Sequence, residues 1–312
     1  MENLIISVNA VAPMFGVIAL GYLAQRMKLI DYASALKINN AAFRVILPCL
    51  LFNIIYRTNL AASVKPKLII FCAAGILIVY ALSSLITRAV EKKPEKRGVM
   101  IQGMFRSNYV ILGMPLASSL TGGGDLGVAA VMTAVAAPLF NVLAVITLEH
   151  YRGNRTSIRE VLIAIVKNPL IVSAVCGIAA LISGVRLPYI LDVIVSDVSV
   201  MATPLMLFLL GACFRATGVG ENRRDLVVTS LFRLIIIPAF CLPAAAFFGF
   251  RGIEFITALI IFASPAAVTS FVMAQSMGGD ADLAAGIVVA TSVVSCVTMF
   301  LWTFLCKQFG MF

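Results

Sequence analysis

Charged residues and histidine are scarce in this chain of 312 residues. Only 12% of the residues are charged, against about a quarter in soluble domains, so the composition excludes a water-soluble globular protein. A single histidine, His150, excludes a metal site with several histidine ligands. No G-x-x-x-x-G-K-[ST] phosphate loop is present, because the Gly-Gly-Gly-Asp stretch lacks the lysine. We therefore predict no enzymatic activity, no cofactor and no bound metal.

Acidic residues and secretory features are also few. Nearly all of the 14 acidic residues fall in predicted loops or at span ends, and only Asp197 lies deeper. This distribution leaves no buried carboxylate pair for sodium or proton binding, and Asp197 is either a coupling residue or an interfacial carboxylate at a helix N-terminus. The first apolar stretch lacks a basic leader, so we interpret it as a retained span. The seven cysteines fall in or beside spans and suggest no disulfide framework.

Hydrophobic residues make up 61% of the chain and form long runs. Ten apolar stretches each approach the roughly 20 residues that cross a bilayer as a helix. The sequence therefore predicts an all-α membrane protein with ten transmembrane helices. The predicted spans are 4–23, 35–55, 68–86, 98–120, 126–148, 161–182, 188–214, 226–250, 255–277 and 283–305.

Basic residues sort to one side of this arrangement. The loops after spans one, three, five and seven hold 13 lysines and arginines, and the opposite side holds 6. Because positive residues are retained in the cytoplasm, both termini are predicted to lie outside. The net charge of +10 is thus a topology signal, and we predict no nucleic-acid partner.

The two halves of the chain resemble each other. A step of 156 residues takes Pro13 to Pro169, Gly21 to Gly177 and Pro48 to Pro204. We therefore predict repeats over residues 1–156 and 157–312. Five spans per half is an odd number, so the second repeat enters the membrane from the opposite side. Inverted repeats are common in secondary transporters, whose substrate sites lie near the midplane.

Span four carries polar residues at lipid depth, namely Arg106, Ser107 and Asn108, followed by Gly113 and Pro115. This pattern is typical of an interrupted helix that faces a cavity. The corresponding position in span nine is occupied by Ser264 and Pro265, and the matched Pro48 and Pro204 are further candidate breaks. Two crossing half-helices would present their N-termini to an anion. The alternative is that the glycine and prolines are ordinary kinks and that Asn108 caps a neighbouring carbonyl.

Other polar residues within spans are candidates for the substrate path. Arg106 either supplies positive potential to an anion or anchors the half-helix. Arg44 and Arg233 either contact substrate, pair with carbonyls or snorkel to the membrane surface, and Lys167 marks an interface. Asn39 in span two is a neutral group that can line a cavity.

The stretch SNYVILGMP around span four resembles the auxin efflux carrier family, which includes plant PIN auxin carriers and bacterial malate and malonate permeases. ASPAAVTSFVMAQ in span nine, NNAAFRVILPCLLF in span two and KNPL at the start of span six are similar to other family segments. The resemblance implies two inverted five-helix repeats with helices four and nine crossing, a scaffold of spans 1, 2, 6 and 7, and a crossover domain of spans 3–5 and 8–10. It also implies elevator-type alternating access for organic anions.

Carried onto this sequence, the resemblance implies that Asn108 and the backbone around Ser107 contact the substrate carboxylate. Ser264 and Pro265 then form the opposing arm, and Asn39 matches an asparagine that precedes the proline of span two in PIN carriers. Ser107 departs from the family, because PIN carriers often have a proline there.

We therefore predict a secondary transporter of a small organic carboxylate in the lipid bilayer of a bacterial inner membrane. The alternatives are a sodium-coupled symporter of the bile-acid type and, from another class, a membrane sensor or channel. A proton or sodium as coupling ion and assembly as a homodimer are left open by the sequence.

Overall fold

The computed structural model describes residues 2–57, 65–122, 126–152, 162–163, 166–214 and 220–312, with only the backbone described for 2–12. Within these ranges the chain is helical, with one isolated antiparallel bridge between Ser107 and Ala266. This agrees with the all-α prediction. Several helices are interrupted along their length, and these interruptions build the candidate site.

The described helices follow one another along the chain in two similar series. The first half of the chain contains α1 (Glu2–Arg26), α2 (Tyr32–Ala41), η1 (Ala42–Ile46), α3 (Leu47–Tyr56), α4 (Pro66–Val90), α5 (Pro94–Phe105), η2 (Tyr109–Gly113), α6 (Met114–Leu120) and α7 (Gly127–Tyr151). The second half contains α9 (Pro169–Ser183), α10 (Tyr189–Cys213), α12 (Arg223–Leu231), η3 (Phe232–Ile236), α13 (Ile237–Phe247), α14 (Gly252–Ala263), α15 (Thr269–Ser276) and α16 (Ala281–Gln308). The η segments are single wide turns of π-helix within longer helices.

Six helices in the described chain are long and apolar enough to cross a membrane, and three shorter apolar helices accompany them. Two pairs of the long helices recur at a constant spacing. α2–η1–α3 and α10 are each 25 residues long and begin 157 residues apart (189 − 32), as do α4 and α12–η3–α13 (223 − 66). This spacing differs by one residue from the step of 156 found in the sequence. Ten spans in two inverted repeats stay a prediction, whereas an integral, multi-pass helical protein agrees with these helices.

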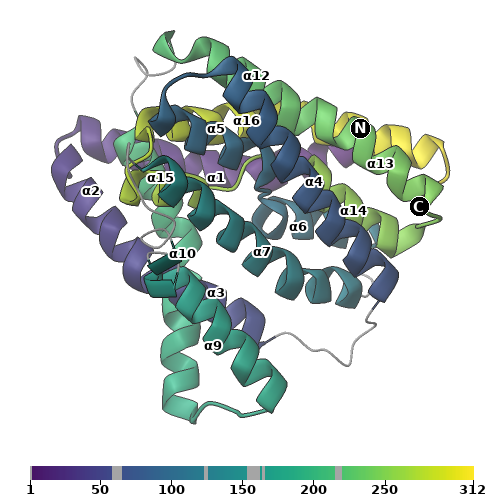
Figure 1. The fold of residues 1–312 in the computed structure, drawn as a ribbon, viewed down its shortest axis with the longest axis horizontal. Helices are drawn as coiled ribbons and strands as arrows, with labels where there is room; N and C mark the ends of the chain where they lie inside the picture. The colour runs from purple at the N-terminus through teal and green to yellow at the C-terminus, as the bar shows by residue number, and fades with distance from the viewer. Residues whose placement is uncertain (1, 58–64, 123–125, 153–161, 164–165, 215–219) are drawn as a thin grey trace.

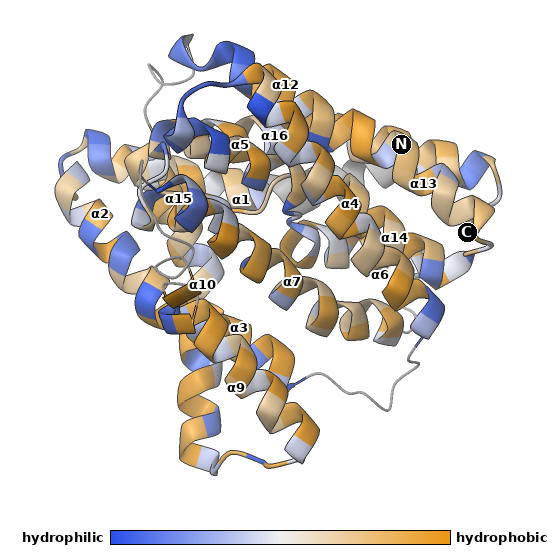
Figure 2. Cartoon of the chain, viewed as in Figure 1, coloured by the Kyte–Doolittle hydropathy of each residue, from blue (hydrophilic) through white to orange (hydrophobic). Residues whose placement is uncertain are grey.

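Contacts between helices fall mainly into two sets (Figure 1). In one set α10 packs against α1, α2 and α3, and α3 packs against α9; α3, α9 and α10 project from the rest of the molecule. In the other set α4 and α7 pack on α5, α13 packs on α14, and α12 and α15 pack on α16. Hydrophilic residues gather around the beginnings of α5 and α12, whereas the projecting helices are largely apolar (Figure 2).

α1 and α10 approach each other so closely that only glycine fits at the contact. A Cβ atom on Gly21 would lie 2.0 Å from the carbonyl oxygen of Phe208, and one on Gly211 would lie 1.9 Å from that of Ile18. The contact is reciprocal, since each glycine faces the carbonyl three residues before the other. Small residues at such positions let helices pack through their backbones.

A proline follows each π-helical segment at the second residue of the next helix. These prolines are Pro48, Pro115 and Pro238. Proline has no N–H for the carbonyl four residues earlier and its ring crowds that carbonyl, so a widened turn relieves the conflict. After η3 the carbonyl concerned is that of Leu234, and it accepts a 2.9 Å hydrogen bond from the indole Nε1 of Trp302.

Candidate functional site

Two helices stop in the middle of the bundle and their ends are joined by backbone hydrogen bonds. α5 ends at Phe105 and α14 ends at Ala263, and each resumes a few residues later. The amide of Asn108 donates to the carbonyl of Pro265 at 2.8 Å, and that of Ala267 donates to Arg106 at 3.3 Å. At membrane depth extended backbone needs such partners, because lipid offers none. The two interrupted segments therefore satisfy each other where they cross.

Local chemistry explains where α14 stops. Ser264 precedes Pro265 and has φ −65° and ψ 152°, the extended conformation that a following proline imposes. In the other crossing segment the interruption covers residues 106–108 and lies before Gly113 and Pro115. Gly113 ends η2 and Pro115 begins α6, so they shape the wide turn after the interruption. Pro48 likewise follows η1, and Pro204 lies inside the continuous α10.

Arg233 binds the C-terminal ends of both interrupted helices. Its Nε donates to Ser264 O at 2.7 Å and its Nη2 donates to Ile261 O at 2.9 Å. On the other helix, Nη1 donates to Met104 O at 3.4 Å and to Phe105 O at 3.3 Å. The last carbonyls of a helix lack intrahelical donors and carry partial negative charge. A buried guanidinium therefore neutralises both ends at once, and Arg233 takes the carbonyl-pairing role that the sequence left open.

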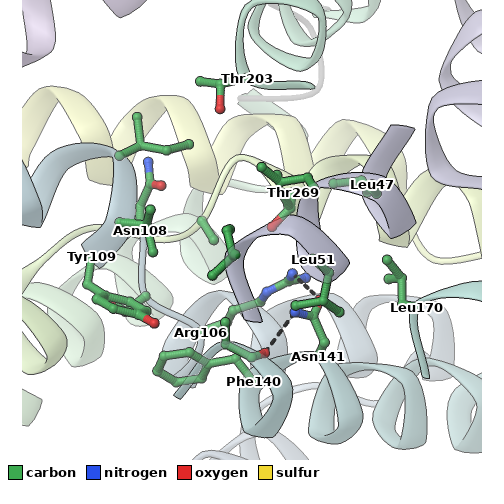
Figure 3. Close-up of a pocket in the computed structure, with 17 residues that line it drawn as sticks. Leu47, Leu51, Arg106, Asn108, Tyr109, Phe140, Asn141, Leu170, Thr203 and Thr269 are labelled. Carbon is green, nitrogen blue, oxygen red and sulfur yellow. Dashed lines mark hydrogen bonds between the residues drawn. The ribbon is translucent and has the colours of Figure 1, made fainter. Parts of the chain in front are cut away.

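A cavity of about 100 Å³ adjoins the crossing. It lies between the interruption of α5, the wide turn η2, and the helices α3, α7, α9, α10 and α15 (Figure 3). Its polar side chains include Arg106, Ser107, Asn108 and Asn141, and much of the remaining lining is apolar.

Arg106 is the charged group of this cavity. It is 4% exposed, and its Nη2 donates a 2.7 Å hydrogen bond to Oδ1 of Asn141 (Figure 3). Asn141 is itself held by a 2.7 Å hydrogen bond from its Nδ2 to Ala137 O. Within the described parts of the chain no carboxylate forms an ion pair with Arg106. A buried cation without a counter-ion is costly, so this cavity favours an anionic occupant.

Asn108 and Ser107 present unused hydrogen-bonding atoms beside Arg106. Both residues are buried, and among the described residues neither Asn108 Nδ2 nor Ser107 Oγ has a hydrogen-bond partner. Asn108 also precedes the first turn of the 12-residue helix Tyr109–Leu120, and Thr269, which begins α15, lines the same cavity. The first amides of a helix lack intrahelical acceptors and favour anions. Two helix beginnings, an amide, a hydroxyl and a guanidinium thus converge on one small space.

Comparison with known proteins identifies the family of the chain. The model of a family described as "Membrane transport protein" matches residues 6–303. The chain belongs to this family. This membership confirms the resemblance to auxin efflux carriers. Among similar members, an uncharacterized transporter of Methanocaldococcus jannaschii is 24% identical over 297 residues, which cover 91% of this chain and 94% of that protein. An uncharacterized transporter of Methanothermobacter thermautotrophicus is 23% identical over 304 residues, 95% of this chain and 97% of that protein.

Within this family member, the predicted site residues occupy different places. Ser264 and Pro265 belong to the crossing, where their carbonyls bind Arg233 and Asn108, and neither lines the cavity. Asn39 lies outside the cavity on α2, where its Nδ2 donates to Val272 O at 3.3 Å and to the side chain of Gln275 on α15. Asp197 is exposed on α10 and does not line the cavity.

The structure adds residues that the sequence interpretation missed. Asn141 and Thr203 line the cavity on α7 and α10, and Thr269 lines it at the start of α15. Asn141 carried a usable signal, because an asparagine in the middle of the apolar stretch Gly127–Tyr151 is rare at lipid depth. Thr203 and Thr269 carried none, since threonine is common in membrane helices and bonds to its own backbone.

Proposed function

We propose that the chain is a secondary transporter of a small organic carboxylate, which binds at the crossing of the two interrupted helices. The observation that carries this proposal is the buried Arg106, which has no carboxylate partner among the residues that the structure describes, next to the Nδ2 of Asn108, which has no partner among them either. A carboxylate accepts hydrogen bonds from both groups, and charge-assisted hydrogen bonds of this kind are strong. Ser107 and the first amides of the half-helix provide further donors.

The size and lining of the cavity favour a small substrate with a short carbon skeleton. Its volume of about 100 Å³ is below the range of about 300 to 1,000 Å³ that is typical of sites for drug-sized ligands. Leu47, Leu51 and Phe140 line it beside the polar groups (Figure 3). These side chains suit the apolar carbons of an organic acid and make an inorganic anion a poorer fit.

The distribution of polar groups supports elevator-type movement. Arg106 and Asn108 lie in the interruption between α5 and η2, and Asn141 lies on α7; all three belong to the segments 66–151 and 223–308 of the proposed crossover domain. The opposite wall comes from α3, α9 and α10 of the proposed scaffold, and apart from Thr203 its side chains are apolar. A substrate held by one set of helices can slide past an apolar wall without losing its polar contacts. In this proposal the whole chain forms two inverted repeats of five helices, and the crossover domain of spans 3–5 and 8–10 carries the substrate between the two membrane faces.

Ligand-dependent thermal stability tests this function. Purified protein is heated with each of a panel of mono- and dicarboxylates, with and without sodium, because a ligand that binds the folded form raises its apparent stability by about 2.7 kcal/mol at 100 times Kd. We expect at least one acid to stabilise the wild-type protein, and Arg106→Gln to weaken that acid at least tenfold. Arg186→Gln removes an exposed arginine and serves as the control. Equal stabilisation of the Arg106→Gln and wild-type proteins would contradict the proposal.

A further inference from the structure

A second cavity of about 470 Å³ lies where α2 passes into η1 and where α7 and α15 end. Arg44, Arg152 and Lys167 line it, and among the described lining residues Glu149 supplies the one carboxylate. The positive-inside count assigns this end to the cytoplasm. The cavity is therefore large enough to hold water, and its described lining has an excess of positive charge.

Two of its three cations have no carboxylate partner in the described chain. Arg152 pairs with Glu149, whose Oε1 lies 3.3 Å from Nη1. Arg44 and Lys167 form no ion pair with any described carboxylate, and both are exposed. Because Glu149 is already neutralised by Arg152, the described residues that line the cavity keep a net charge of about +2 for an incoming anion.

The beginning of α9 adds to this field. Asn168 is buried and caps the helix, with its Oδ1 accepting a 3.0 Å hydrogen bond from Leu170 N, and Pro169 starts the helix at the wall of the cavity. The N-terminus of a helix carries partial positive charge. Because Asn168 and Pro169 line the cavity, this end of α9 faces the same space as Arg44 and Lys167.

Four segments line both this cavity and the central cavity, namely α7, α9, α15 and the η1–α3 helix. Along α7 the wall changes from Asn141 at the central cavity to Glu149 at the second, and along α15 it changes from Thr269 to Ser276. On α9 the adjacent Leu170 and Pro169 line the two spaces, and the η1–α3 helix contributes to both. The two cavities are therefore stacked along one boundary between the proposed scaffold and crossover domains.

We propose that the cavity around Arg44 and Lys167 is a second binding site for a soluble organic anion, at the mouth of the path to the central site. This inference rests on the proposed function for the class of its ligand. Lysine and arginine attract carboxylate or phosphate groups over several ångströms, and their exposure keeps binding weak enough for release toward either side. The site raises the local concentration of the anion next to the crossing.

Binding of radiolabelled succinate at low ionic strength tests this site. Equilibrium dialysis with the detergent-purified chain counts bound succinate in the wild type and in Arg44→Gln/Lys167→Gln. We expect the double variant to lose one class of sites, with at least a tenfold loss of affinity. Lys28→Gln/Lys37→Gln removes the same charge from exposed residues outside the cavity and should bind like wild type. Arg44→Lys/Lys167→Arg should restore binding, which a purely structural role would not predict.

Further measurements separate the possible failures. Melting of Arg44→Gln/Lys167→Gln, followed by the fluorescence of the single Trp302, checks that the variant is folded. Succinate binding by the folded variant that equals wild type overturns the second site. If the cavity binds phosphatidylglycerol in mixed micelles and does not bind succinate, its ligand is a lipid headgroup. That result also overturns the proposed site for a soluble anion. Asn108→Ala tests the central site independently. If that variant keeps all binding whereas the Arg44→Gln/Lys167→Gln variant loses a site, the proposed central site fails and the second site stands.

Discussion

Arg233 Nε donates a 2.7 Å hydrogen bond to the carbonyl of Ser264, the residue at which α14 stops. The same guanidinium reaches Phe105 O at 3.3 Å, where α5 stops. The negative ends of two crossing half-helices thus share one buried cation that is only 1% exposed. The positive ends of the following half-helices are left for the cavity. This division of charge makes one side of the crossing structural and the other available to an anion.

Replacing Arg233 by methionine should destabilise the protein strongly. The variant keeps a long apolar side chain but leaves four carbonyl groups without their donor, and each buried unsatisfied group costs about 1 to 3 kcal/mol. We expect a loss of at least about 3 kcal/mol, measured as a lower melting temperature in detergent. Arg223→Gln changes an exposed arginine of the same long helix and should melt close to wild type. Equal melting of the Arg233→Met and wild-type proteins would show that the shared cap is dispensable.

Gly21 and Gly211 should tolerate no side chain. Alanine at Gly21 places a methyl group 2.0 Å from Phe208 O, so α1 and α10 must separate, at a cost of about 1 to 3 kcal/mol for overpacking. Gly16 on the same helix has open space around it. Gly16→Ala should therefore be neutral or slightly stabilising, since alanine favours helix by up to about 1 kcal/mol. Melting temperatures of the two variants test this, and equal values would contradict the close approach.

Asn39 should affect the rate of transport more than the affinity for substrate. It connects α2 to α15 through Val272 O and Gln275, and these helices belong to the two sets that slide in the proposed mechanism. Asn39→Ala removes the connection without touching the cavity. We expect an altered maximal uptake rate in proteoliposomes with the substrate Kd within about twofold of wild type. A changed Kd at unchanged rate would instead place Asn39 at the substrate.

The sequence predicted the interruptions because their signals are local. Arg106 to Asn108 are polar residues at lipid depth, and Pro265 removes a donor and extends Ser264. The partners of these residues carried no local signal. Arg233 reaches Phe105 across 128 positions, and a chain that is apolar on all sides of its helices has no periodic stripe to show which faces meet. The sequence match paired Gly21 with Gly177, whereas in the structure Gly21 and Gly211 face each other's helix.

Both the charge and the planar shape of the Arg106 guanidinium should contribute to binding of the acid. Arg106→Lys keeps the positive charge but loses the planar fork that donates to Asn141 and leaves further N–H groups for a ligand. We expect binding of the stabilising acid to weaken by about tenfold in Arg106→Lys and further in Arg106→Gln. Titration of both purified variants with that acid measures this order. Binding that is the same in both variants would indicate that Arg106 only anchors the half-helix.

Uptake of a radiolabelled form of the stabilising acid into proteoliposomes tests the central claim most directly. Wild-type protein and Ser119→Ala, an exposed change on α6, should show saturable uptake. Asn108→Ala removes the unused amide beside Arg106 and should lower the initial rate at least tenfold at an unchanged melting temperature. Uptake by Asn108→Ala at the wild-type rate would contradict a carboxylate site at the crossing of the two interrupted helices.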